Sequence, residues 1–316
     1  MKLVVTDAAT VTGGDISLDF LKKYGEVEIF ELTPPELVAE RIKDADIVIC
    51  NKTRLSKENM KSARKLKYIG LFATGYNNID IDYAREHGIA VCNAPGYSTE
   101  SVAQHTIALL MAIVNRVGEY NRTVSEGDWI KSSTFSYFPI PIIELNGKVL
   151  GIIGYGSIGR RVGDIARAFG MKLLVYNRSR ITDPNAEQVD LDTLLKNADV
   201  VSLHCPLNDA SNGVIGKDAL AKMKQGAILI NTARGPLIDE AALREALDSG
   251  KLAGAGVDVL CTEPMTADCS LYGAPNCFIT PHIAWAGLEP RTRLMGIVGE
   301  NIEAFLNGSP VNNVAK

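Results

Sequence analysis

The sequence predicts an α/β protein with two parallel-sheet domains, and three observations support this. Short runs of β-branched residues alternate with longer helical patterns along the whole chain, which is typical of parallel sheets covered by helices. The chain has 316 residues, whereas one hydrophobic core serves about 250 to 300 residues at most. A glycine-rich motif directly after an apolar strand also marks a new start of the strand–helix pattern near the middle of the chain.

The first domain is expected to contain five strands, over residues 2–6, 27–30, 46–50, 68–72 and 90–92. A long helical pattern follows over residues 98–121, because apolar side chains recur three or four positions apart there. We expect this stretch to form one helix that leads the chain into the second domain.

The second domain is expected to begin at the strand "VLGII" before the glycine-rich motif. Its further strands are expected at residues 172–176, 199–204, 227–231, 254–260 and 277–280. The last stretch, residues 289–308, is an amphipathic helical pattern with an apolar side formed by Leu294, Ile297, Val298 and Ile302. Since no strand follows this helix, we expect it to pack on the first domain.

Composition and charge exclude several classes of function. The formal net charge is −4 without long runs of one sign, so nucleic acid and anionic membranes are not expected partners. The apolar run over residues 107–114 is far shorter than the roughly 18 residues of a spanning helix, and an aspartate at position 7 argues against a signal peptide. The six cysteines include no Cys-x-x-Cys pair, so we expect a soluble, cytoplasmic protein that acts on a small molecule.

The motif "GYGSIG" supplies Gly154, Gly156 and Gly159 at G-x-G-x-x-G spacing. A dinucleotide site needs these glycines for a tight turn, for approach of the pyrophosphate to the backbone, and for close packing of helix on strand. The buried face of the next helix is expected to be formed by Val162, Ile165, Ala166 and Phe169. A glycine-rich turn without a ligand is the alternative, but the agreement of strand, motif and helix favours dinucleotide binding.

The stretch "LVYNRSR", residues 174–180, indicates which dinucleotide is expected. An aspartate or glutamate normally accepts from the ribose 2′-hydroxyl at this place, and it would repel a 2′-phosphate. The chain has Asn177, Arg178, Ser179 and Arg180 there instead. These residues remove the repulsion and supply donors, so we expect NADP(H) to be preferred and NAD(H) to be possible. A solvated basic turn is the alternative.

A nicotinamide enzyme needs a proton donor near neutral pH, and the chain has four histidines. His87 is expected at an exposed helix end, and His105 lies within a helix, where packing or capping is the better interpretation. His204 and His282 follow strands, at the edge of the sheet where ligands bind in open α/β folds. A structural role is the better interpretation of His204, but position alone does not choose between the two.

Three charged residues follow other strands of the second domain: Arg234 follows one strand, and Asp258 and Glu263 follow the next. A guanidinium can bind the carboxylate of a 2-oxo acid and polarise its carbonyl. A carboxylate can hold an imidazole in one tautomer and favour its protonated form. Taken singly, Arg234 and Glu263 would more often be surface charges.

A zinc site is a further alternative. Its possible ligands are Cys261, Cys269, Cys277 and His282. These residues lack the tight paired spacing of structural zinc sites, so we expect free thiols and no metal.

Four segments, "GYGSIG", "NTARG", "GVDVLCTEP" and "TPHIAW", together resemble the D-2-hydroxyacid dehydrogenase family, whose members have them in this order. The resemblance covers nearly the whole chain. The stretches "LFATGYNNID", "STESVAQHTIALL" and "HIAWA" are most similar to the branch of glycerate dehydrogenases and hydroxypyruvate or glyoxylate reductases. The resemblance implies hydride transfer between a nicotinamide cofactor and a small 2-oxo or 2-hydroxy acid.

The resemblance also implies roles for individual residues. The catalytic set would be Arg234, Glu263 and His282, with His282 as general acid and base. The substrate would contact Thr74, Gly75, Arg234 and Trp285. The cofactor would lie along Thr106, Gly154, Gly156, Ser157, Ile158, Gly159, Asn177, Arg178, Ser179, Cys205, Pro206, Thr232 and Asp258.

The architecture that the resemblance implies is a Rossmann cofactor domain inserted into a flavodoxin-like substrate domain. The cofactor domain would cover residues 99–284, the substrate domain residues 1–98 plus 285–316, and homodimerisation would run through the cofactor domain. A dinucleotide-sensing regulator of the corepressor type is the alternative function, but Arg234, Glu263 and His282 together favour an enzyme.

Overall fold

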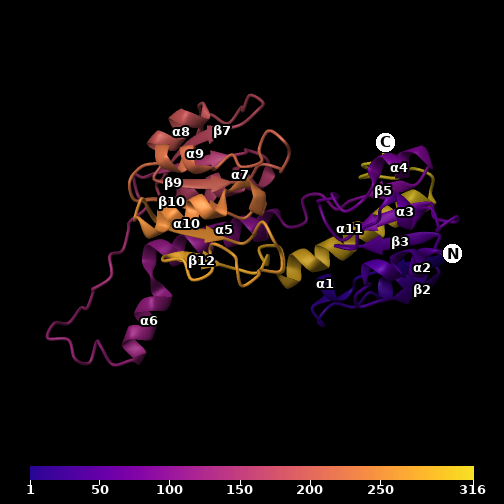
Figure 1. Ribbon diagram of the computed structural model, residues 1–316, viewed down its shortest axis with the longest axis horizontal. Coiled ribbons are helices and arrows are strands. Elements are labelled where there is room, and N and C mark those ends of the chain that lie inside the picture. The colour runs from indigo at the N-terminus through magenta and orange to yellow at the C-terminus, as the bar shows by residue number, and fades with distance from the viewer. The chain divides into compact units, whose positions relative to one another are not determined.

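The computed structural model describes residues 1–316, which divide into two compact units (Figure 1). Unit 1 comprises residues 1–98 and 285–316, and unit 2 comprises residues 99–284. Each unit contains one sheet in which all neighbouring strands run parallel, with a hydrophobic core on either face of the sheet. The predicted α/β class with two parallel-sheet domains is confirmed.

The sheet of unit 1 has the strand order β2-β1-β3-β4-β5, which is the flavodoxin-like order. Its strands are β1 (Lys2–Val5), β2 (Glu26–Ile29), β3 (Ile47–Cys50), β4 (Tyr68–Leu71) and β5 (Ala90–Cys92). Strands β3 and β4 are buried along their whole length, which explains their uninterrupted apolar sequences.

The helical elements of unit 1 are α1 (Ala9–Thr12), η1 (Asp19–Tyr24), η2 (Pro35–Leu37), α2 (Val38–Ile42), α3 (Lys57–Met60), α4 (Ile81–Glu86) and α11 (Leu288–Leu306). The C-terminal helix α11 packs on this sheet, as expected from the sequence. Its residues Leu294, Met295, Val298 and Ile302 share one core with strand residues such as Leu3. Ile297, which was expected on the apolar side, lies at the margin of that core and is only partly buried.

The sheet of unit 2 has the order β12-β11-β10-β9-β6-β7-β8, which is the Rossmann order extended by one strand. Its strands are β6 (Val149–Ile153), β7 (Lys172–Tyr176), β8 (Glu187–Gln188), β9 (Val200–Leu203), β10 (Ala227–Asn231), β11 (Leu252–Val257) and β12 (Cys277–Ile279). Its helical elements are α5 (Thr99–Asn115), α6 (Val117–Ser125), α7 (Ser157–Ala168), α8 (Leu191–Asn197), α9 (Lys217–Lys222), η3 (Gly235–Leu237) and α10 (Glu240–Asp248). The edge strand β8 was not expected, because two exposed polar residues carry no strand pattern.

Two expectations about helices were wrong. The stretch expected as one helix is broken between α5 and α6 at Arg116, whose φ of 54° is left-handed and cannot continue a right-handed helix. In α7, Phe169 was expected to be buried but is 39% exposed, because it lies just beyond the last helical turn. Gly163 is buried in its place, where a side-chain carbon would come within 2.9 Å of Leu173. None of the helices has the length and apolar character required to cross a membrane.

Candidate active site

The loops after five strands of unit 2 emerge at the carboxyl edge of its sheet. Parallel strands end at the same edge, and β12, β11, β10, β9 and β6 are neighbours in that order. Ligands bind at this edge in doubly wound sheets. The expected site residues follow these strands: Gly154 follows β6, Cys205 follows β9, Thr232 and Arg234 follow β10, Asp258 and Glu263 follow β11, and His282 follows β12.

Two of the three glycines in the loop after β6 are required for steric reasons, and the reason differs between them. Gly154 has a φ of 94°, and a side-chain carbon there would lie 2.6 Å from the backbone nitrogen of Cys205. A side-chain carbon at Gly159 would lie 2.2 Å from the carbonyl oxygen of Gly154, so only glycine lets α7 pack this closely. Around Gly156, by contrast, the space for a side-chain carbon is open.

The open side of this loop fits the pyrophosphate of a dinucleotide. No side chain caps the N-terminus of α7, whose first turn contains Ser157 and Ile158. Uncapped N–H groups at a helix N-terminus bind anions, and the space beside Gly156 lets a ligand approach the backbone. The residues present therefore fit the class of ligand that the motif predicts.

The turn after β7 holds Asn177 in a hydrogen-bond network. Its Oδ1 accepts from the backbone N–H of Tyr155 at 3.0 Å, and its Nδ2 donates to the carbonyl oxygen of Ser179 at 2.9 Å. Arg178 and Arg180 are exposed and form no ion pair. Two unpaired cations thus lie in the turn that is hydrogen-bonded to the glycine-rich loop.

His282 and Glu263 are in direct contact. Nδ1 of His282 lies 2.7 Å from Oε2 of Glu263, and Oε1 of Glu263 accepts from the backbone N–H of Leu260 at 3.0 Å. Because an ionised carboxylate only accepts, Nδ1 carries the proton in this pair and Nε2 is left for a ligand. The side chains of His282 and Glu263 are 26% and 36% exposed, so reactants can reach them.

The backbone around His282 is fixed by Asp258. His282 has a left-handed φ of 56°, and its N–H donates to the carbonyl oxygen of Asp258 at 2.8 Å. The next two N–H groups, those of Ile283 and Ala284, donate to the Asp258 carboxylate at 2.9 Å each. One aspartate therefore holds three consecutive residues of this loop.

Asp258 is 1% exposed, and its carboxylate is surrounded by donors. Thr280 Oγ1 donates to its Oδ1 at 2.6 Å, and His105 Nε2 lies 3.4 Å from the same oxygen. Burial alone would raise the pKa of Asp258, but hydrogen bonds from two side chains and two backbone N–H groups outweigh it and keep the pKa below its ordinary value. The carboxylate is therefore ionised at neutral pH.

The loop that carries Arg234 is shaped by Asn231, which is 1% exposed at the end of β10. Asn231 Nδ2 donates to the carbonyl oxygen of Arg234 at 2.8 Å, and its Oδ1 accepts from the N–H of Ala233 at 3.0 Å. A side-chain carbon at Gly235 would lie 2.0 Å from the backbone carbon of Leu260, so this loop is packed on the loop after β11. Arg234 is exposed, and Nη1 of its guanidinium donates to the carbonyl oxygen of Ala233 at 2.6 Å.

His204 has the structural environment that the sequence favours for it. Its Nε2 lies 2.8 Å from the Oγ of Ser202, and burial lowers its pKa to about 4. The ring is therefore neutral at pH 7. The next residue, Cys205, is partly buried, which raises the pKa of its thiol, and Pro206 is exposed beside it.

The cysteine series after β11 does not converge on a metal site. Burial raises the pKa of Cys261 and that of Cys277 to about 12, so both thiols keep their protons at neutral pH. No group of three or more His, Cys, Asp and Glu side chains is arranged to hold a metal ion.

Unit 1 carries the remaining expected residues. Thr74 and Gly75 follow β4, and the loop is held because Thr74 Oγ1 donates to the carbonyl oxygen of Ala94 at 2.8 Å. Asn93 Nδ2 also donates to the carbonyl oxygen of Thr74 at 2.7 Å. Trp285 is partly buried against the core that α11 forms with the sheet.

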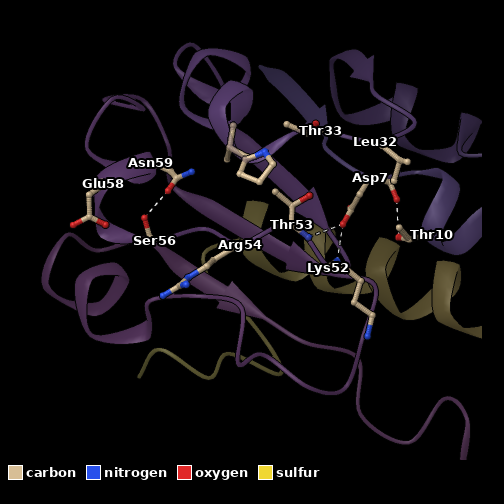
Figure 2. A pocket seen from close by; sticks show the side chains of 12 residues that line it. Asp7, Thr10, Leu32, Thr33, Lys52, Thr53, Arg54, Ser56, Glu58 and Asn59 are labelled. Carbon is tan, nitrogen blue, oxygen red and sulfur yellow. Dashed lines mark hydrogen bonds between the residues drawn. The ribbon is translucent and has the colours of Figure 1, made fainter. Parts of the chain in front are cut away.

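A cavity of about 640 Å³ lies at the carboxyl edge of the unit 1 sheet, beside the ends of β1, β2 and β3 (Figure 2). The carboxylate of Asp7, which is 3% exposed, accepts from the backbone N–H groups of Asn51, Lys52 and Thr53 at 2.9, 2.6 and 2.7 Å. The charged residues that line the cavity are Asp7, Lys52, Arg54 and Glu58. Two cations and two anions cancel, so net charge selects no ligand here.

Three residues with evident parts in the site of unit 2 were missed by sequence reasoning: His105, Asn231 and Thr280. None belongs to the glycine-rich motif, and their partners lie on other elements. The one available signal for His105 is its neighbour Thr106, which is expected beside the cofactor. Thr106 Oγ1 lies 2.8 Å from Oγ1 of Thr232.

An open glycine-rich loop and a histidine–carboxylate pair at the carboxyl edge of one Rossmann sheet are typical of oxidoreductases that use a dinucleotide. Comparison with known proteins narrows this class. Residues 107–284 match the family model described as D-isomer specific 2-hydroxyacid dehydrogenase, NAD binding domain. The chain belongs to this family and is an oxidoreductase that transfers a hydride between a nicotinamide cofactor and a 2-hydroxy acid, as the sequence predicted.

Individual relatives agree with this assignment. The chain is 47% identical to a hydroxypyruvate reductase from Blautia hydrogenotrophica, with 100% of both chains covered. It is 39% identical to a glycerate dehydrogenase from Methylorubrum extorquens, over 99% of this chain and 98% of that one. A solved structure of an acyclic imino acid reductase in complex with NADPH and D-Arg has a TM-score of 0.89 and 35% identity, covering 99% of this chain and 100% of that one. None of these relatives supports the regulator alternative.

Proposed function

We propose that the chain reduces small 2-oxo acids, hydroxypyruvate and glyoxylate foremost, to D-glycerate and glycolate, with His282 as the proton donor. The observation that carries the proposal is the contact between His282 Nδ1 and Glu263 at 2.7 Å. The loop of Glu263, after β11, neighbours the loop of Arg234, after β10. The hydroxypyruvate reductase and glycerate dehydrogenase relatives support this substrate class.

The proton moves through Nε2 of His282, because Nδ1 donates to Glu263. Nε2 protonates the carbonyl oxygen of the 2-oxo acid during reduction and takes the proton back during oxidation. Glu263 keeps the ring oriented. Arg234 binds the substrate carboxylate, polarises the carbonyl and stabilises the alkoxide that develops on the carbonyl oxygen. The bound nicotinamide supplies the hydride.

We assign unit 2 to the cofactor and unit 1 to the substrate. The first turn of α7 would hold the pyrophosphate, and the loops after β9, β10 and β11 would follow the cofactor through Cys205, Pro206, Thr232 and Asp258, with Thr106 of α5 beside them. In unit 1, we propose that the backbone N–H groups of Thr74 and Gly75 bind the substrate carboxylate and that Trp285 limits the size of the substrate.

The test of this function is a panel of 2-oxo acids, with steady-state rates measured for the purified protein with NADPH and with NADH. We expect turnover of hydroxypyruvate and glyoxylate, one D-glycerate formed per cofactor oxidised with hydroxypyruvate, and slower turnover of bulkier acids. Binding of NADPH without turnover of any 2-oxo acid would contradict the function and favour the regulator.

We also propose that NADPH is preferred over NADH. Arg178 and Arg180 are unpaired cations in the turn after β7, and Asn177 places no negative charge beside them. A 2′-phosphate would gain charge-assisted hydrogen bonds there. The NADPH complex of the imino acid reductase supports this use of the fold.

The double variant Arg178→Ala with Asn177→Asp tests the preference for NADPH. The aspartate introduced in place of Asn177 could still accept from the N–H of Tyr155, while its charge would repel a 2′-phosphate. We expect kcat/KM to favour NADPH in the natural chain and NADH in the double variant. Arg64→Ala, at an exposed and unpaired arginine of unit 1, is the control. A higher kcat/KM for NADH in the natural chain would contradict the preference without affecting the dehydrogenase assignment.

We propose that the chain forms a homodimer through unit 2. Helix α6 and the segment after it extend away from the sheet of this unit (Figure 1). Its large exposed apolar side chains include Trp129, Ile130, Phe135, Phe138 and Ile142. Light scattering after gel filtration should give the mass of a dimer, and Phe135→Ser with Phe138→Ser should give a monomer. Tyr272→Ser, at a side chain that is 64% exposed elsewhere in unit 2, is the matched control.

A cytoplasmic location completes the proposal. All six cysteines are free thiols, which suits a reducing compartment. Fractionation of cells that express the tagged chain should recover it with cytoplasmic markers, and recovery in an exported fraction would contradict this location.

A further inference from the structure

Helix α5 supplies a histidine to the loop that carries His282. His105 lies in the middle of α5, and its Nε2 is 2.9 Å from Oγ1 of Thr280 and 3.4 Å from Oδ1 of Asp258. Its side chain is 20% exposed and that of Asp258 is 1% exposed, so the contacts are largely shielded from water. A role beyond packing or capping was not expected for His105 from the sequence.

The hydrogen bonds of this cluster assign its protons. Oγ1 of Thr280 lies 2.6 Å from Oδ1 of Asp258, and a carboxylate that is ionised only accepts, so the single hydroxyl proton of Thr280 points to Asp258. The Thr280 oxygen then has only lone pairs to offer His105. Nε2 of His105 must therefore carry a proton and donate it to Thr280.

The same cluster is joined by hydrogen bonds to the backbone next to His282. The Asp258 carboxylate that Thr280 and His105 support also accepts from the two backbone N–H groups that follow His282. The left-handed backbone of His282, with a φ of 56°, costs about 1–2 kcal/mol for a residue with a side chain. That conformation persists only while the surrounding hydrogen bonds hold it.

Helix α5 contacts the same loop at a second point. Ser101 Oγ donates to the carbonyl oxygen of Ala284 at 2.6 Å. Ser101 and His105 are four residues apart, so they lie on one face of α5 and hold the loop of His282 together. The next residue, Thr106, contacts Thr232 in the neighbouring loop at 2.8 Å. One helix therefore orients two loops of the site.

We propose that His105 is a positioning residue for hydride transfer. By donating to Thr280 it orders the Asp258 carboxylate, which in turn keeps His282 in the conformation where Nδ1 meets Glu263. The inference rests on the proposed role of His282 as the proton donor. His105 itself touches neither substrate nor cofactor in this assignment.

The test compares His105→Leu with His105→Gln in the full-length protein. Leucine removes the donor at similar volume, whereas the amide of glutamine can place an N–H near the position of Nε2. We expect His105→Leu to lower kcat for hydroxypyruvate by about 10- to 100-fold, as a small misplacement of a catalytic group does. The KM for hydroxypyruvate and the Kd for NADPH should change by less than about threefold, and His105→Gln should restore most of kcat.

A merely structural histidine would behave differently. Its replacement would lower the melting temperature and the active fraction without a selective loss of kcat, and His105→Gln would be no more active than His105→Leu. If His105→Leu does not fold, Thr280→Val breaks the same relay with little change of shape, and the same selective loss of kcat is expected. His87→Gln, at an exposed histidine of unit 1, is the control and should keep the natural kcat.

Measuring His282→Ala in the same assay separates the positioning role from the proposed function. An impaired His282→Ala beside a natural kcat in His105→Leu or in Thr280→Val would overturn the positioning role and leave the proposed function standing. A fully active His282→Ala would overturn the proposed function itself.

Discussion

Both units use a buried aspartate at the end of a strand to hold a loop, but only one of these loops carries a histidine. Asp7 follows β1 in unit 1 and is 3% exposed, and Asp258 follows β11 in unit 2 and is 1% exposed. Asp7 accepts from three consecutive backbone N–H groups, beginning with Asn51. Asp258 accepts from two backbone N–H groups and from the hydroxyl of Thr280.

The difference between the two sites is what surrounds the carboxylate. Around Asp7 the donors are three backbone N–H groups of one loop and the hydroxyl of the adjacent Thr6 at 3.4 Å, so the aspartate stabilises the turn after β3. Around Asp258, helix α5 adds His105. The loop after β12 holds His282 in a left-handed conformation, in contact with Glu263. A buried carboxylate thus fixes a loop in both units, and it bears on chemistry only where that loop presents an acid.

The largest expected effect is that of removing this acid. His282→Ala should lower kcat for hydroxypyruvate by about 100-fold or more, because general acid catalysis is lost. The Kd for NADPH should stay within about twofold, since the first turn of α7 is untouched. Stopped-flow rates and fluorescence titration measure the two quantities. A near-natural kcat at neutral pH would show that another residue is the acid. The loop that Asp258 holds would then differ from the loop of Asp7 in structure but not in function.

A smaller effect is expected at the neighbouring loop, which Asn231 holds without an aspartate. Arg234→Lys keeps the charge but not the planar fork, so bidentate recognition of the substrate carboxylate is lost. We expect kcat/KM for hydroxypyruvate to fall by about tenfold or more. Arg64→Lys in unit 1 controls for a general effect of the exchange. An unchanged kcat/KM would show that other groups bind the carboxylate.

An effect on stability alone, and none on substrate binding, is expected at a histidine at the same edge that no carboxylate supports. Burial lowers the pKa of His204 to about 4 from an ordinary value of 6.5. Between these values the unfolded chain binds a proton that the folded chain does not, so this residue destabilises the fold progressively as the pH falls from 6.5 to about 4. The contribution reaches about 3 kcal/mol at the lower limit.

His204→Gln cannot titrate and can keep the hydrogen bond to Ser202. Urea unfolding at pH 7 and at pH 4.5 should therefore show a smaller loss of stability on acidification in His204→Gln than in the natural chain. Equal losses of stability in the two proteins would mean that His204 is not buried as a neutral ring.

Much of the fold could be predicted from the sequence, because buried parallel strands are short apolar runs separated by helical patterns. The expected ends of the strands differed from the observed ones by three residues at most, and the largest difference is at the end of β11 (Leu252–Val257), which was expected at 254–260. The break at Arg116 could not be predicted, since the apolar spacing continues through Val117. The side chain of Val117 is instead 67% exposed.

In the candidate site, features that adjacent residues determine could be predicted, and contacts between residues far apart in the sequence could not. The glycine-rich loop could be predicted because the need for glycine is local: turn, helix and strand are adjacent in the sequence. His282 and Glu263 entered through the resemblance, since position alone did not choose between His204 and His282, and Glu263 taken singly would more often be a surface charge. The contact of His105 with Thr280 joins residues 175 positions apart, and no periodic pattern reports such a pairing.

The comparison is tested most directly by making the same change at both aspartates. Asp7→Asn and Asp258→Asn each leave an amide facing backbone donors, so both should lose about 1–3 kcal/mol of stability in urea unfolding. With saturating hydroxypyruvate and NADPH, Asp258→Asn should lower the kcat of the folded enzyme at least about tenfold, while Asp7→Asn should keep kcat within about twofold. Equal kcat values in the two folded variants would contradict the claim that the Asp258 network orients the proton donor.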